Sequence, residues 1–170
     1  MLNTITQWVN TLVNGSDKLA LLPPLKAIGD RYSSQTLSSA GLAIKTGGSA
    51  IVKSGSAFYA LANGILVTKT ANTEQAALSG TVTNAKFNVF CFYVDSAGTL
   101  TSAMGTEGAT LAAVVFPPVP EKKAQIGFVV INPTGTGNFV GGTTPLDDAT
   151  VVPTAAYVNT IGPFDPTVIP

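Results

Sequence analysis

The sequence predicts an all-β protein: an antiparallel β-sandwich or barrel-like domain with a short N-terminal helix or arm and an extended proline-rich C-terminal tail. Short apolar runs recur about every 8–12 residues, and glycine, asparagine and serine turns separate them without alternating helices. Residues 87–94 carry apolar side chains on both faces, which is typical of a strand covered on both sides. No period of about 20–50 residues repeats, which argues against a solenoid or a propeller.

The length of 170 residues fits one domain, or one domain with an arm. We divide the chain into two parts. Residues 1–35 are expected to form a helix and a connector that together make a candidate docking arm. Residues 36–170 are expected to form the β domain, whose extended tail begins at about residue 145.

The one good helix candidate covers residues 4–14. Its apolar side chains recur at helical spacing and form one stripe: Ile5, Trp8, Val9, Leu12 and Val13. A capping box begins it and Asn14-Gly15 is a plausible stop. The stripe must pack either within this domain or on a neighbouring subunit, and the sequence leaves both open. Pro23-Pro24 is expected to break any helix, and residues 29–34 to be a connector.

The first strands are expected to be short, over residues 40–46, 50–53 and 57–61. Asn63-Gly64 is the strongest hairpin signal, because both residues tolerate the positive φ of a type I′ turn. Residues 65–69 supply the second strand of that hairpin.

The central hairpin is predicted from residues 87–94 and 99–104, which flank a turn. Residues 110–116 are expected to form a strand that ends at Pro117, because proline cannot donate to a ladder. Residues 124–132 read as another buried strand, stopped by Pro133.

The C-terminal quarter is rich in glycine and proline. Residues 134–144 are expected to form a loop or a close backbone contact. Residues 145–170 contain five prolines, with a short strand or helix expected at 155–161. Such a tail cannot make its own core, so it either wraps this domain or lies along a partner.

The composition is low in charge. Charged residues make up 11% of the chain against about 25% in typical soluble domains, while apolar residues stand at 45%. Small uncharged polar side chains cost little to desolvate, which favours a surface covered by neighbouring subunits over an ordinary threonine-rich β surface. Nine basic residues balance nine acidic ones and are scattered, so we expect neither nucleic acid nor a membrane as a partner. The N-terminus resembles neither a signal peptide nor a membrane span, so an intracellular product is expected.

The chemistry available to the chain is limited. It has no histidine and one cysteine, Cys91, so we expect no catalytic triad, no metal site, no cofactor and no enzymatic activity. Asp147-Asp148 is best interpreted as a solvated turn, with a calcium site including Asn138 as the alternative. Four scattered carboxylates could in principle form a glycosidase pair, but each lies beside turn residues or in a polar loop, and a surface position explains all of them: Asp95, Glu107, Glu121 and Asp165.

Aromatic side chains outside the central strands are better candidates for contacts between subunits, because buried aromatic residues dominate interface energetics. Together with two apolar residues of the N-terminal stripe they form the predicted interaction set: Trp8, Val9, Leu12, Phe139, Tyr157 and Phe164.

The order of several segments looks familiar. These are residues 63–69 (NGILVTK), 92–98 (FYVDSAG), 126–133 (IGFVVINP), 139–147 (FVGGTTPLD) and 157–163 (YVNTIGP). Between about residues 60 and 164 the chain thereby resembles tailed-bacteriophage virion structural proteins of the capsid decoration, or cement, type. These motifs are glycine and strand patterns rather than catalytic signatures.

The resemblance implies a β-rich homo-oligomer, most often a trimer, on the outer capsid surface of a virion. Such a protein is made in the host cytoplasm and stabilises the head by bridging subunits of the major capsid protein. Residues 1–35 lie outside the match, so their role as a capsid-contacting arm is our own inference. The alternative is a tail, fibre or head-fibre module that binds other virion proteins or host glycan.

Overall fold

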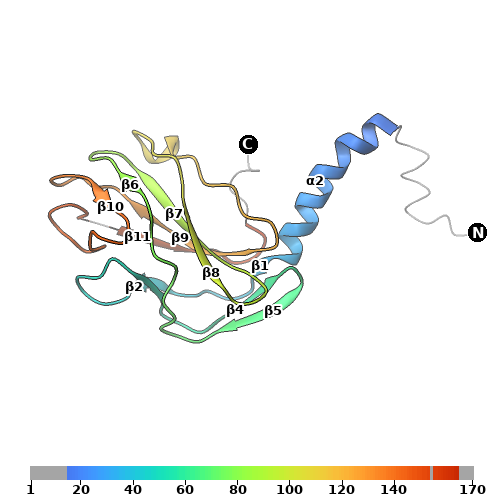
Figure 1. Ribbon diagram of the computed structural model, residues 1–170, viewed down its shortest axis with the longest axis horizontal. Coiled ribbons are helices and arrows are strands. Elements are labelled where there is room, and N and C mark those ends of the chain that lie inside the picture. Colours follow the sequence, from blue (N-terminus) through green and yellow to red (C-terminus); the bar gives the residue numbers. More distant parts are fainter. Residues whose placement is uncertain (1–14, 154, 165–170) are drawn as a thin grey trace, which may run out of the picture.

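The computed structural model describes residues 15–153 and 155–164. The helix predicted over residues 4–14 therefore lies outside the described residues, as do Trp8, Val9, Leu12 and Asp165. The described chain is built mainly from antiparallel strands with one long helix at its N-terminal side, which confirms the all-β prediction (Figure 1).

The largest sheet has four antiparallel strands in the order β11-β9-β7-β8. Its strands are β7 (Asn88–Val94), β8 (Leu100–Met104), β9 (Ala124–Ile131) and β11 (Ala155–Asn159). Every residue of β7 is buried, and β7 and β8 form the predicted hairpin. The expectation of a central strand covered on both faces is confirmed.

A second sheet has three strands in the order β1-β4-β5. These are β1 (Gln35–Thr36), β4 (Phe58–Ala62) and β5 (Ile65–Lys69). Asn63 and Gly64 connect β4 to β5 with φ of 53° and 76°, the two positive angles that a type I′ turn requires. The predicted hairpin is confirmed.

Two short strand pairs complete the sheets. β2 (Leu42–Ile44) pairs with β3 (Val52–Ser54), and β6 (Thr81–Val82) pairs with β10 (Phe139–Val140). The strand β10 lies within the glycine-rich segment that we expected to form a loop or a close backbone contact, so the loop expectation is wrong at these two residues. The expected close contact is present nearby, because a Cβ at Gly135 would overlap the carbonyl oxygen of Thr150.

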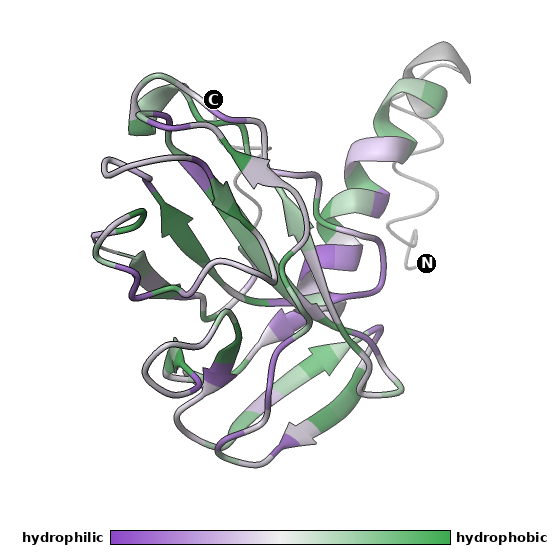
Figure 2. Ribbon diagram, turned by 60° about the vertical axis from the view of Figure 1, so that its left-hand side comes forward, coloured by the Kyte–Doolittle hydropathy of each residue, from purple (hydrophilic) through white to green (hydrophobic). Residues whose placement is uncertain are grey.

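The main core lies between the large sheet and the sheet that contains β4 and β5, which makes the domain sandwich-like (Figures 1 and 2). Phe58 from β4, Phe92 from β7 and Ile126 from β9 are all fully buried in it. The opposite face of β7 carries Val89, Cys91 and Tyr93, which form a second buried cluster.

The segment between β8 and β9 covers this second cluster. Within it, the strand predicted at residues 110–116 is wrong, because a short 3-10 helix (Leu111–Ala113) and an isolated bridge between Thr106 and Val115 stand there. Val114 and Phe116 pack against the second cluster instead of joining a ladder. These two residues are therefore apolar because they cover one face of the sheet, and not because they form one of its strands.

The helix α2 (Gly15–Ser33) passes through Pro23 and Pro24. The expectation of a helix break at the prolines is therefore wrong. The expectation of a connector over residues 29–34 is wrong as far as Ser33, where the helix ends. Two prolines remove the N–H groups that would bond the carbonyls of Leu19 and Ala20. Both residues are exposed, so water can satisfy these carbonyls and the helix continues.

The described part of the C-terminal segment wraps this domain. Leu146 and Val152 are buried in the main core, and β11 pairs with β9 along its full length. Residues 155–159 are thus a strand, one of the two forms we expected there.

Candidate interaction surfaces

The helix α2 projects away from the β domain (Figure 1). Every residue from 19 to 29 is exposed, although many of them are large and apolar. Leu19 is 75% exposed, Leu22 64% and Leu25 60%. Side chains of this kind are normally covered in a folded protein, so α2 is a candidate surface for another molecule.

The C-terminal end of α2 is fixed to the domain. The Asp30 carboxylate accepts a hydrogen bond from the backbone N–H of Lys122 at 2.9 Å and forms an ion pair with Arg31. The Arg31 side chain also donates to the carbonyl of Pro120 at 3.2 Å. The carbonyl of Ser33 accepts a bond from the N–H of Gly64 at the hairpin turn. These contacts set the direction in which the helix leaves the domain.

One face of α2 borders a groove against the loop that contains Val119 and Glu121. The helix residues that line this groove are Leu22, Pro23, Lys26, Ala27, Asp30 and Arg31. Lys26 also forms an ion pair with Glu121 at 3.7 Å. This face is therefore turned toward the chain's own domain.

A different set of side chains lies on the opposite face of the helix. We call this set the α2 stripe: Leu21, Leu25, Ile28 and Tyr32, with exposed fractions of 44%, 60%, 52% and 64%. At 100° per residue these four positions fall within one narrow sector, roughly opposite Lys26 and Asp30. The α2 stripe contacts neither core cluster.

A second apolar surface lies on the outer face of the β1-β4-β5 sheet, whose strands β4 and β5 consist largely of hydrophobic residues (Figure 2). Tyr59 and Leu66 are 48% and 59% exposed, and Leu61 pairs directly with Leu66 across the strands. Leu37 follows the buried Thr36 and bonds the carbonyl of Tyr59 through its N–H, so strand alternation places its 46% exposed side chain on the outer face. We call Leu37, Tyr59, Leu61 and Leu66 the outer-sheet patch.

The structure separates the three predicted interaction residues that it describes. Phe139 is fully buried and meets Phe90 edge-on with ring centroids 5.9 Å apart. The prediction that Phe139 anchors a neighbouring subunit is therefore wrong, because pairing of β10 with β6 places its ring in this chain's own core.

Tyr157 and Phe164 are partly buried against the same domain. Tyr157 packs on the main core, and this burial, with a smaller contribution from the charge of Asp147, raises the pKa of its hydroxyl to about 12. Phe164 stacks on Phe128 at 6.2 Å. Neither residue lies in the α2 stripe or the outer-sheet patch.

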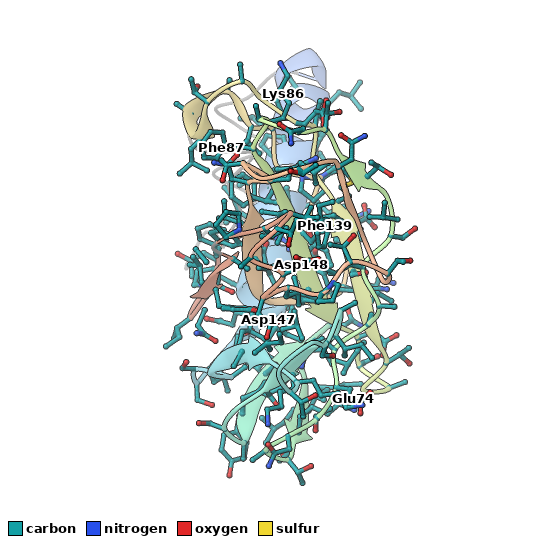
Figure 3. The ribbon with its side chains drawn as sticks, turned by 90° about the vertical axis from the view of Figure 1, so that its left-hand side faces the viewer. Glu74, Lys86, Phe87, Phe139, Asp147 and Asp148 are labelled. Carbon is teal, nitrogen blue, oxygen red and sulfur yellow. The ribbon has the colours of Figure 1, made fainter. Side chains whose placement is uncertain are left out.

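The carboxylates singled out in the sequence bind backbone groups. Asp147 accepts the N–H of Gly48 and Asp148 accepts the N–H of Thr150, both at the end of the molecule opposite α2 (Figure 3). Asn138 accepts the N–H of Asn84 rather than facing these carboxylates. Among the described residues, no group of three or more acidic, cysteine or histidine side chains could hold a metal ion.

Two further carboxylates stabilise turns in their charged form. Asp95 accepts the N–H groups of Thr99 at 2.8 Å and Ala97 at 3.0 Å, and these bonds lower its pKa. Glu107 accepts both the N–H and the hydroxyl of Thr83 at 2.9 Å, which likewise lowers the pKa of Glu107.

Cys91 has an inert environment. Burial raises the pKa of its thiol to about 12, which outweighs the opposite effect of a hydrogen bond with Tyr93. The thiolate is the reactive form, so this cysteine is shielded from modification in the folded protein.

Sequence reasoning missed both the α2 stripe and the outer-sheet patch. The spacing of Leu21, Leu25 and Ile28 is a helical signal in the sequence, but two adjacent prolines predict a helix break at the same place. The outer-sheet patch left a weaker signal, because apolar residues on both faces of a short strand also fit a buried strand.

No family model, no curated protein and no solved structure matches this chain. No helix in the described part of the chain is long and apolar enough to span a membrane.

Proposed function

We propose that this protein is a non-enzymatic structural protein of a tailed-phage virion, acting as a decoration or cement protein on the outer capsid. The observation that carries the proposal is the combination of two exposed apolar surfaces with a chain that has 11% charged residues. Surfaces of this kind need partners to cover them, and a resemblance to cement proteins suggests the major capsid protein as one partner.

The outer-sheet patch is the surface we assign to the capsid. It lies on the exposed face of a three-stranded sheet, and a surface of this kind suits docking onto a broad shell better than insertion into a pocket. Burying one leucine fully is worth roughly 1.5–3 kcal/mol, so the exposed side chains of the patch can supply a useful share of the binding free energy.

Cementing follows from preferential binding. A protein that binds the expanded shell more tightly than it binds the relaxed or disassembled subunits stabilises the expanded shell by mass action. An oligomer that binds two capsid subunits at once binds more tightly than one copy alone, because the second binding event is intramolecular and has a high effective concentration. This gain requires no new type of contact.

Binding of the isolated protein to purified expanded capsids tests the proposal. Leu66→Asp should reduce capsid occupancy by at least tenfold, because it places a charge within the outer-sheet patch, directly beside Leu61. Leu111→Asp is the matched control, since Leu111 is 54% exposed and lies away from the patch. Occupancy can be measured by cosedimentation over a dilution series, at low and at high salt.

The result expected for wild type is binding that persists at high salt, because apolar burial is not screened. Failure of wild type to bind shells, or undiminished binding of Leu66→Asp, contradicts the proposal. Specific binding on a glycan array, together with imaging of the chain at the tail, would instead support the fibre alternative.

A further inference from the structure

We infer that the α2 helices of three or four copies of this chain pack together as a parallel bundle through the α2 stripe. The inference rests on the proposed function in one respect. The proposed function assigns the outer-sheet patch to the capsid, and the inference assigns the remaining apolar surface, the α2 stripe, to other copies of this chain.

The spacing of the α2 stripe is that of a coiled coil. Leu21, Leu25, Ile28 and Tyr32 are separated by four, three and four residues, which places them at heptad positions d, a, d and a. In a parallel bundle of identical helices each of these residues meets its own equivalent in one layer. The α2 helix of another copy carries the same stripe, so its apolar side chains match those of the first copy in spacing and in chemistry.

The opposite side of α2 is arranged for solvent and for the chain's own domain. Lys26 and Asp30, which contact the loop at residues 120–122, occupy heptad positions b and f. The carbonyls of Leu19 and Ala20, which the two prolines leave without helical partners, also fall at positions b and c. These groups need water, so the helix can bury only the face that carries the α2 stripe.

The identity of the central layers bears on the number of helices. Leucine at a with isoleucine at d favours three or four strands over two, and Leu25 and Ile28 form that pair here. Leu22 at position e lines the groove against Val119 and Glu121, so it lies at the border of the face that carries the α2 stripe and is not counted among the bundle layers. Closed cyclic symmetry makes the helices parallel and places all the β domains at one end.

The mass of the full-length protein in solution tests the inference directly. Sedimentation equilibrium should give three or four times the chain mass of 17.3 kDa. A monomer or a dimer as the largest species over the accessible concentration range overturns the inference.

Substitutions locate the contact. The double variant Leu25→Asp/Ile28→Asp should sediment as a monomer, because it puts charges into two adjacent layers. Leu19→Asp is the matched control, since it makes the same kind of change on the same helix at an exposed position outside the α2 stripe. Near-UV circular dichroism should show an intact β domain in both variants. Equal mass for the double variant and wild type overturns the assignment.

Crosslinking tests the direction of the helices. Ile28→Cys should form a disulfide between copies on mild oxidation, because equivalent residues share a layer in a parallel bundle. Cys91 is buried and does not compete. Absence of this link, with an oligomeric mass, overturns the parallel arrangement.

All three measurements are made without capsids. Failure of the bundle therefore leaves the capsid test on Leu66 unaffected, and failure of capsid binding leaves the bundle unaffected.

Discussion

Single residues of this protein show two ways of placing a polar or ionisable group in a β domain. Cys91 and Tyr93 lie within a strand that is fully buried, where desolvation raises the pKa of the thiol. Asp95 and Glu107 lie at turns, where backbone N–H groups stabilise the carboxylates and lower their pKa values. The same chain therefore suppresses charge in its centre and uses it at its edges.

The two turn carboxylates predict acid sensitivity. Because their pKa values are lower in the folded state, each contributes stability that is present above its unfolded pKa, about 3.9 for Asp and 4.3 for Glu. This contribution is lost as the pH falls through the lower folded-state values. The melting temperature should therefore be steady from about pH 7 to pH 5 and fall below about pH 4.

The double variant Asp95→Asn/Glu107→Gln isolates this effect. It should melt below wild type at neutral pH, and the difference should shrink as the pH falls, because the wild-type carboxylates become neutral too. A difference between the two proteins that stays constant between pH 7 and pH 3, followed by differential scanning calorimetry, would refute the assignment.

At the scale of elements, a β-bulge in β9 shifts the alternation of inward and outward side chains along this strand. Its pairing with β7 changes register between Phe92 and Tyr93, which face Gly127 and Gln125, so that Ile126 is the extra residue. With a strict period of two, Ala124 and Ile126 would point to one face of the sheet and Val129 and Ile131 to the other. Because of the bulge, all four side chains point into the main core.

Gly127 allows β11 to approach this bulge. Its φ is 157°, and a Cβ at this position would overlap the carbonyl oxygen of Val158 and lie 2.7 Å from Leu42 Cδ1. Gly127→Ala should therefore lower the free energy of unfolding by about 1–3 kcal/mol, as overpacking does in other cores. Urea unfolding followed by fluorescence measures this change.

Gly29→Ala is the matched control for that experiment. A Cβ at Gly29 has no neighbour within 4 Å, and alanine is about 1 kcal/mol more favourable than glycine inside a helix. The control should leave stability unchanged or raise it slightly. If Gly127→Ala behaved in the same way as the control, the close approach of β11 would not limit this position.

At the scale of the whole molecule, the β domain and α2 are nearly independent. Both core clusters consist of residues from Ala40 onward, so α2 contributes to neither. Among the described residues, its hydrogen bonds and ion pairs with the domain come from its last turns and reach the loop at residues 120–122 and the hairpin turn at Gly64. We expect the domain to fold without the helix, and the helix to serve contacts with other molecules.

Removal of residues 1–29 tests this division. The truncated protein should unfold cooperatively with a melting temperature within a few degrees of wild type, because it keeps both cores. The same truncation should abolish oligomerisation if the α2 stripe forms the bundle. Loss of cooperative unfolding would instead mean that α2 supports the domain.

Some elements of this fold can be predicted from local sequence patterns. Apolar residues in both registers of residues 88–94 predicted a strand buried on two sides, and the pair Asn63-Gly64 predicted a type I′ hairpin. Each of these inferences depends on neighbouring residues alone, which is why the sequence sufficed for the all-β class, for the central hairpin and for β9.

The remaining features depended on long-range contacts. Phe139 became a core residue because β10 pairs with β6, more than fifty residues earlier in the chain. Val114 and Phe116 cover the sheet without joining it, and their apolar pattern is the same in either role. The α2 stripe and the outer-sheet patch were recognisable only once the packed domain showed which apolar side chains it left uncovered. Local periodicity encodes which residues avoid water, whereas the tertiary structure alone decides which of them find cover within the chain.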